Sequence, residues 1–310
     1  MYGGSLSRKI GKKLSVLAVV VYLAFSVAAH AKSGLVKHTT TWQGLRRYYA
    51  VYTPRTLAAK PSLVLYLNST SASPATEPPY FGLPPWEALA EQYGFVMVWP
   101  VSSYNSAHAL WYWDCYETDT TFPINPDDSG FLRWLITSLQ GQFAIGTGNT
   151  FVTGMSSGGF MAHRAATDLS DIVAAIAPVS GMIDIHPIGV NFLPPDPTNP
   201  ISVYELHGDE DTEVPYCGGT GWFWGGLHDS LASVDDSMNF WISANSCTHR
   251  NTTQPLCTNG QPTAGVNRQD ATGCNDGVEV VFEREKNVGH VWLRGTEAKV
   301  WAFFQNHARH

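Results

Sequence analysis

The sequence predicts an α/β fold with a mostly parallel, twisted β-sheet and helices on both of its faces. Short apolar runs, typical of strands buried on both faces, alternate along the chain with segments of helical periodicity. Polar and glycine-rich clusters come directly after several of these runs. That is where functional loops leave the carboxyl ends of parallel strands.

Local signals set the bounds of the elements. Gly94 is suited to end a helix, Pro100 stops a strand, and Asp127-Asp128-Ser129 offers side-chain oxygens to the first N–H groups of a helix. The predicted strands cover residues 46–52, 63–67, 95–99, 150–153, 172–179, 201–206 and 278–283. The predicted helices cover residues 86–93, 127–139, 160–166, 230–245 and 296–307.

The segment 1–31 is predicted to be a secretory signal peptide. Basic residues precede an apolar run over 14–29, and Ala29-His30-Ala31 forms a small-x-small cleavage site. The run is about 16 residues long, which is short for a membrane span, so a retained anchor is the less favoured alternative. We therefore expect a secreted or periplasmic protein in which 32–310 forms one domain with a full core.

The charge balance argues against two classes of partner. The chain has 19 basic and 26 acidic residues and a net charge of −7. Loss of the leader removes four basic and no acidic residues, which leaves −11. Because an acidic surface without a basic stripe does not attract nucleic acid or anionic membranes, we expect neither as a partner. We expect a monomer.

The five cysteines all lie beyond the leader. In an oxidising compartment they predict up to two disulfides and one free thiol, and the pairing is left open. Their spacing lacks the paired Cys-x-x-Cys or nearby histidines of a zinc site, so we predict no metal and no cofactor. The cysteines are Cys115, Cys217, Cys247, Cys257 and Cys274.

The segment Gly154-Met155-Ser156-Ser157-Gly158-Gly159 lies between a predicted strand and a predicted helix. Glycines on both sides of Ser156 permit a sharp turn that leaves the serine hydroxyl exposed, an arrangement called a nucleophile elbow. The same turn puts the backbone N–H of Ser157 at a helix N-terminus, where it can stabilise an oxyanion. A glycine-rich structural turn without chemistry is the alternative.

A serine nucleophile needs a base, and the base needs a carboxylate that orients it. In an α/β-hydrolase these groups follow the serine in the order acid, then histidine. His290 stands in a glycine-containing loop between the last predicted strand and the last helix, and it is the candidate base. Asp211 is the candidate acid after the strand 201–206, with Asp209 and Glu210 as alternatives on spacing alone.

Six segments together resemble the polyhydroxybutyrate depolymerase family of secreted esterases, which also includes feruloyl and acetyl-xylan esterases. The resemblance runs in family order from about residue 45 to the C-terminus. It implies the α/β-hydrolase fold, with Ser156 as nucleophile, Asp211 as acid and His290 as base. It also implies that Trp292 lines the cleft. The matching segments are 94–100 (GFVMVWP), 127–131 (DDSGF), 154–162 (GMSSGGFMA), 174–181 (AAIAPVSG), 207–215 (HGDEDTEVP) and 289–292 (GHVW).

One position departs from the family pattern. After the strand that corresponds to 63–67 the family has His-Gly, whereas this chain reads Asn68-Ser69-Thr70. That loop supplies the second oxyanion donor in the family. The backbone N–H of Thr70, or of Ser69, can still serve because it does not depend on the side chain. A misplaced donor costs about 3 kcal/mol in the transition state.

The resemblance implies a secreted serine ester hydrolase of polyhydroxybutyrate-depolymerase type that acts through an acyl-enzyme on polyester oligomers. Trp111 and Trp113, with Tyr116, follow one predicted strand, and the aromatic run 222–224 follows the loop of Asp211. We expect Trp111 and Trp113 to contact substrate. The alternatives are a feruloyl or acetyl-xylan esterase acting on phenolic or acetyl esters, a peptidase with the same triad, and a non-catalytic binding protein.

Overall fold

The structure is a computed structural model that describes Met1 and residues 33–71, 73, 86–115, 123–183, 195–223 and 226–309. The chain divides into two units, residues 1–31 and 32–310. The predicted signal peptide falls on the first unit and lies outside the described residues. Tyr116, Trp224 and the side chains of 222–230 are likewise not described.

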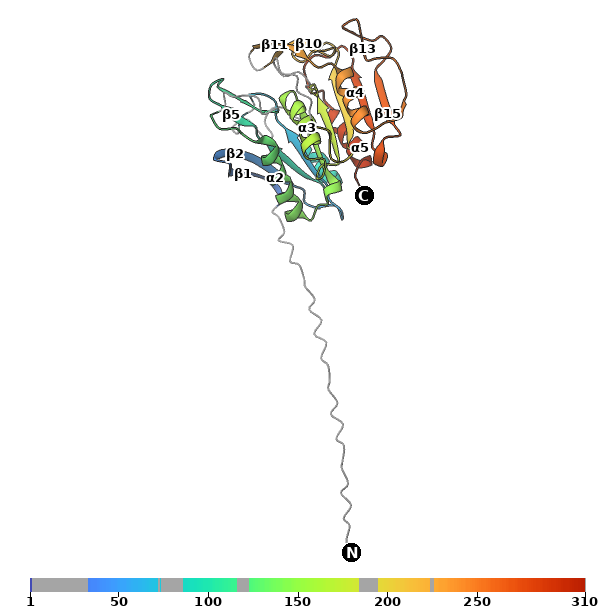
Figure 1. Ribbon diagram of the computed structural model, residues 1–310. Coiled ribbons are helices and arrows are strands. Elements are labelled where there is room, and N and C mark those ends of the chain that lie inside the picture. Colours follow the sequence, from blue (N-terminus) through green and yellow to red (C-terminus); the bar gives the residue numbers. More distant parts are fainter. Residues whose placement is uncertain are drawn as a thin grey trace. The chain divides into compact units, whose positions relative to one another are not determined.

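A ten-stranded sheet forms the centre of the unit 32–310 (Figure 1). Its strands, in order across the sheet, are β1 (Gly34–Trp42), β2 (Leu45–Thr53), β4 (Val96–Pro100), β3 (Leu63–Leu67), β7 (Thr150–Met155), β8 (Ala175–Val179), β9 (Ser202–Gly208), β16 (Val280–Glu285), β15 (Arg268–Thr272) and β12 (His249–Arg250). The ladders from β4 to β16 are parallel, and those at the two edges are antiparallel. The predicted fold class is confirmed.

Helices cover both faces of this sheet. They are α1 (Trp86–Tyr93), α2 (Asp128–Phe143), α3 (Ser157–Asp168), α4 (Val234–Ala244) and α5 (Thr296–Asn306). Side chains of α1 and α5 share one core cluster with Val64 and Tyr66, which are alternate residues of β3. On the other face α2 packs beside α3, and α3 contacts α4 through His163 and Trp241 (Figure 1). None of the helices in the described part of the chain combines the length and apolar character needed to cross a bilayer.

The differences from the predicted elements are the nine-residue edge strand β1, which was not predicted, and several short polar strands. Three small hairpins, β5–β6 (Ser103–Asn105, Leu110–Tyr112), β10–β11 (Gly219–Phe223, Gly226–Leu231) and β13–β14 (Cys257–Thr258, Gln261–Pro262), were not predicted. The helix expected over 230–245 begins at Val234. Its first residues belong to β11, and Ser233 forms a capping box with Asp236.

The predicted pattern of two disulfides and one thiol is confirmed. Cys217 pairs with Cys257 and Cys247 pairs with Cys274, while Cys115 is free and buried. Cys217 comes directly after the loop that contains Asp211. The bond to Cys257 therefore ties the end of that loop to β13.

Removing the cross-link at this loop should destabilise the domain. The bond closes a sequence separation of 40 residues, for which the chain-entropy model gives about 4 kcal/mol. We expect the double variant Cys217→Ser, Cys257→Ser to lose this free energy of unfolding in urea titrations. Cys115→Ala removes a thiol but no cross-link and should lose much less. Equal midpoints for the double variant and the wild type would contradict the prediction.

Candidate active site

Ser156 occupies the turn between β7 and α3 in the conformation of a nucleophile elbow. Its backbone has φ +57° and ψ −125°, a left-handed region that residues other than glycine rarely adopt. A Cβ atom on Gly158 would overlap the carbonyl oxygen of Leu67, and one on Gly154 would meet the same strand. The glycines therefore let the turn close against β3, with the N–H of Ser157 at the start of α3.

The loops of the candidate site leave one edge of the sheet side by side. At three strand ends the first N–H of the loop donates to a carbonyl at or near the carboxyl end of the next strand. These bonds join Ser156 to Val179 at 3.0 Å, Ser180 to Leu206 at 3.0 Å and Asp209 to Glu285 at 3.1 Å. The edge thus carries the loop starts of β7, β8 and β9 and the end of β16, in that order.

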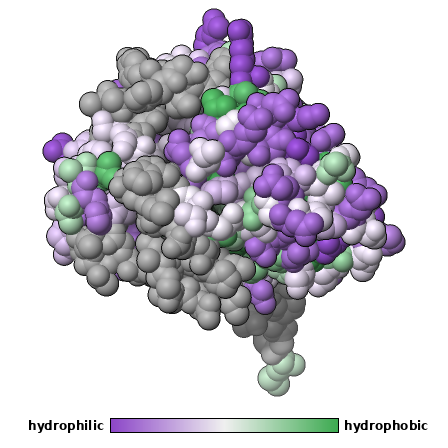
Figure 2. Space-filling model, turned by 90° about the horizontal axis from the view of Figure 1, so that it is seen from above, coloured by the Kyte–Doolittle hydropathy of each residue, from purple (hydrophilic) through white to green (hydrophobic). Residues whose placement is uncertain are grey.

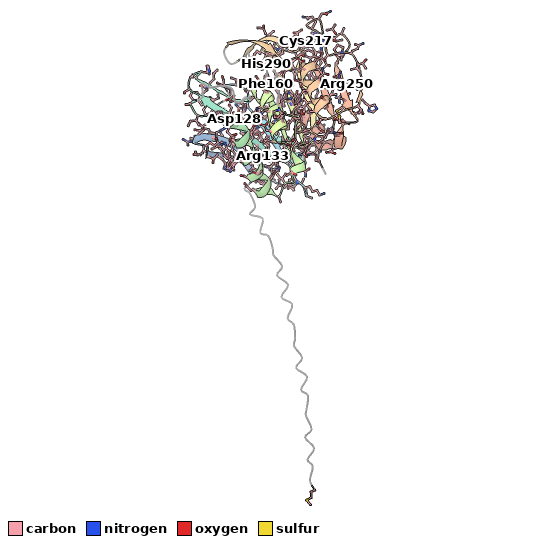
Figure 3. All side chains as sticks on the ribbon, in the orientation of Figure 1. Asp128, Arg133, Phe160, Cys217, Arg250 and His290 are labelled. Atoms are coloured by element: carbon pink, nitrogen blue, oxygen red, sulfur yellow. A yellow bond between two sulfur atoms is a disulfide. The ribbon has the colours of Figure 1, made fainter. Side chains whose placement is uncertain are left out.

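Asp211 and His290 are joined by a short hydrogen bond. The imidazole Nδ1 and Asp211 Oδ2 lie 2.7 Å apart, and the N–H must donate because an ionised carboxylate only accepts. Asp211 Oδ1 accepts from the backbone N–H groups of Glu213 and Val214, each at 2.9 Å. This orientation leaves Nε2 of His290 as the nitrogen able to take a proton. Figure 3 shows His290 at the upper end of the domain.

A second histidine also contacts the aspartate. His207 is fully buried at the end of β9, and its Nε2 lies 2.8 Å from the carbonyl oxygen of Val214 and 3.4 Å from Asp211 Oδ2. Burial pushes the pKa of Asp211 upward. The hydrogen bonds from His207 and His290 outweigh burial and hold the pKa below its ordinary value. Asp211 is therefore a carboxylate that two imidazoles share.

The two alternative acids have other surroundings. Arg284 Nε donates to Asp209 at 2.7 Å, and the backbone N–H of Asn287 donates to the same carboxylate at 2.6 Å. Glu210 is exposed. The geometry thus favours Asp211 as the partner of His290. Within the described segments, no group of three or more His, Cys, Asp or Glu side chains is arranged to hold a metal ion.

The loop that carries His290 crosses the ends of the central strands. Its start packs on Gly208 at the end of β9, where a Cβ atom would overlap the loop backbone. Two residues after His290, the Trp292 ring packs edge-on against Tyr66 of β3, with centroids 5.2 Å apart. Strands β8 and β7 lie between β9 and β3, a span of about 14 Å that four extended residues can cover. His290 lies in the middle of this path, and its contact with Ser156 stays a prediction.

The loop after β3 lies against the elbow. Ser69 Oγ donates to the carbonyl oxygen of Met155 at 3.1 Å. The side-chain amide of Asn68 forms two hydrogen bonds with Ser102. Asn68 Nδ2 donates to Ser102 Oγ at 2.9 Å, and the backbone N–H of Ser102 donates to Asn68 Oδ1 at 2.8 Å. These bonds fix the backbone of the loop beside the elbow. The N–H of Thr70 as second oxyanion donor stays a prediction.

The three tryptophans expected at the substrate cleft have different surroundings. Trp113 is fully buried, and its Nε1 donates to the carbonyl oxygen of Asn68 at 3.0 Å, so it supports the loop after β3 and is closed to substrate. This corrects the expected substrate contact. Trp111 is partly exposed, and its carbonyl accepts from the N–H of Ser71 at 2.7 Å. Contact of Trp111 and Trp292 with substrate stays a prediction.

A buried pair of titratable side chains lies beneath the elbow helix. Glu205 of β9 has its Oε2 3.7 Å from Nε2 of His163 on α3, and both side chains are inaccessible to solvent. Burial lowers the pKa of His163 to about 3, and its Nδ1 accepts from Trp241 at 2.9 Å. Burial raises the pKa of Glu205 well above its usual range, so the carboxyl group is neutral. Its oxygens have no hydrogen-bond partner among the described residues.

His207 and Glu205 were not predicted as members of the site. Glu205 lies inside an apolar strand, and the sequence gives no sign that its side chain approaches a histidine on a helix. His207 does carry a signal. It stands in the His-Gly-x-x-Asp segment that bears the family resemblance, four residues before Asp211.

Comparison with known proteins gives partial sequence matches. No protein-family model matches the chain. The probable acetylxylan esterase A of Neosartorya fischeri is 30% identical over 132 residues, which are 43% of this chain and 34% of the relative. Acetylxylan esterase A of Aspergillus awamori is 29% identical over 132 residues, 43% of this chain and 41% of the relative. The match spans less than half of the length of these curated relatives.

Structural similarity extends over more of the chain. The solved acetyl xylan esterase from Aspergillus awamori superposes with a TM-score of 0.55 at 18% identity, covering 87% of this chain and 99% of that one. A likeness at this identity establishes the fold. The chain has the α/β-hydrolase fold.

The isosteric substitution Glu205→Gln should change how stability depends on pH. The folded-state pKa of Glu205 is raised above the unfolded value of about 4.3. Its stabilising contribution is therefore full below that value and declines as pH rises, because the unfolded chain releases a proton that the folded chain retains. As pH rises above the unfolded value, the wild type should lose stability relative to the variant.

Urea unfolding at several pH values measures this difference. Glu210→Gln removes an exposed carboxylate and serves as the control. Parallel stability curves for wild type and Glu205→Gln would contradict a neutral Glu205.

Proposed function

We propose that the chain is a secreted carboxylic ester hydrolase that releases acetate from acetylated xylan. The observation that carries the proposal is the hydrogen bond between His290 and Asp211, on a loop path that leads over the strand end bearing Ser156 in its elbow. The curated relatives named as acetylxylan esterases support the acetyl-xylan alternative over the polyhydroxybutyrate reading. Feruloyl esters are the next candidates because they share the chemistry.

The proposed reaction has two halves. Nε2 of His290 takes the proton of Ser156 Oγ as the oxygen attacks the ester carbonyl, and Asp211 stabilises the imidazolium that forms. The N–H groups of Ser157 and Thr70 hold the oxyanion. His290 then gives its proton to the leaving alcohol, and water hydrolyses the acetyl-enzyme by the same steps.

Secretion belongs to the same proposal. Two disulfides persist in oxidising compartments and are uncommon in the cytosol. Loss of the segment 1–31 would leave 32–310 as the single catalytic domain, acting as a monomer.

Substitution of each proposed triad member should remove most of the activity. We expect Ser156→Ala, His290→Ala and Asp211→Asn each to lower kcat for p-nitrophenyl acetate by roughly 10³-fold or more, because the three groups act as a unit. Glu210→Gln changes an exposed carboxylate on the acid loop and should retain wild-type rates. Substantial turnover by Ser156→Ala would overturn the assignment.

A substrate panel tests the proposed specificity. Acetylated xylan should give a higher kcat/KM than hydroxybutyrate oligomers or methyl ferulate, measured by acetate, hydroxybutyrate and ferulate release. Faster turnover of the oligomers would favour the depolymerase reading. Cleavage of a peptide in preference to all three esters would contradict ester hydrolysis as the main activity.

A further inference from the structure

A second carboxylate faces His290 on the side of the ring opposite to Asp211. Oε2 of Glu213 lies 3.8 Å from Nε2, whereas Asp211 contacts Nδ1. The His290 side chain is 10% exposed and the Glu213 side chain 53% exposed, so Glu213 reaches solvent where the imidazole is largely covered. The backbone N–H of Glu213 donates to Asp211 Oδ1, which fixes where this side chain begins.

In the described part of the chain, no lysine or arginine pairs with this carboxylate. Among the described residues, the one ion-pair partner of Glu213 is His290 itself. Arg284 of β16 is paired with Asp209. The other charged group that contacts the His290 ring is Asp211, and His207 contacts the same carboxylate. Hydrophilic residues predominate on the described surface seen from this side (Figure 2).

The position of Glu213 places its carboxylate close to where the alcohol part of a bound ester would lie. In the reaction proposed above, Nε2 gives its proton to the leaving alcohol. The alcohol part of the bound ester must therefore pass beside Nε2, and Glu213 lies within one side-chain length of it. We propose that Glu213 is a specificity-determining residue, whose charge makes the site favour esters of neutral or cationic alcohols over esters of anionic alcohols. The inference rests on the proposed ester hydrolysis.

Coulomb's law gives the expected size of the effect. For unit charges about 6 Å apart, and an effective dielectric constant of roughly 40 to 80 at a half-exposed position, the attraction amounts to about threefold to tenfold in kcat/KM. Salt screens charges at such a position, so the effect should shrink as ionic strength rises. Neutral sugar esters suit this site better than esters of sugar acids.

Three acetate esters that differ in the charge of the alcohol test the proposal. Acetylcholine and 3,3-dimethylbutyl acetate have nearly the same shape, with and without a positive charge, and 4-acetoxybutyrate carries a negative charge. With acetate release followed at low ionic strength, the wild type should prefer the cation over its neutral isostere by about threefold to tenfold and should turn over the anion slowest. Glu213→Gln should bring the cation-to-neutral ratio close to one, and Glu213→Lys should reverse the order.

Controls separate the possible failures. Glu210→Gln removes an exposed carboxylate from the same loop and should keep the wild-type ratio. Raising salt to about 1 M should reduce the wild-type ratio without any substitution, so the charge effect is testable even where a Glu213 variant fails to fold. A ratio that neither salt nor Glu213→Gln alters overturns the proposal. Lack of turnover of the neutral ester by the wild type would overturn ester hydrolysis instead.

Discussion

The left-handed backbone of Ser156 is the constraint on which the rest of the candidate site depends. A residue with a side chain holds φ +57° only where its surroundings fix it. Here the turn is fixed by the N–H bond to Val179, by the close approach of Gly158 to β3, and by the small residues that seat α3 on the sheet. The turn can therefore form only where the parallel strands β3, β7, β8 and β9 are paired in this order.

The same sheet edge carries the loop of the candidate acid, and the candidate base contacts that acid. The loop that follows β9 folds back on itself because Asp211 Oδ1 accepts two of its own backbone N–H groups. This leaves Oδ2 for His290 and His207, and the sharing explains how a buried carboxylate stays ionised. The loop of His290 then spans the strand ends between Gly208 and β3. Each group is thus positioned by backbone contacts as well as by its own side chain.

The sequence predicted those helices and strands whose bounds are set by a strong local signal. The strand 63–67 and the helix 86–93 match to the residue, because a continuous apolar run and Gly94 mark their bounds. The strands β12 and β15 are polar edge strands and carry no such signal. Trp113 was expected at the cleft as a loop aromatic, but a long-range hydrogen bond to Asn68 buries it. The approach of Glu213 to His290 depends on how a loop turns, which spacing does not encode.

Labelling with a fluorophosphonate tests the central claim most directly, because the probe reacts with a serine only where a base and an oxyanion site activate it. Intact-mass measurement should show one adduct per chain, and peptide mapping should find it on Ser156. The Ser156→Ala variant should remain unlabelled. Absence of an adduct on folded wild-type protein, or an adduct on a different serine, would contradict Ser156 as the nucleophile.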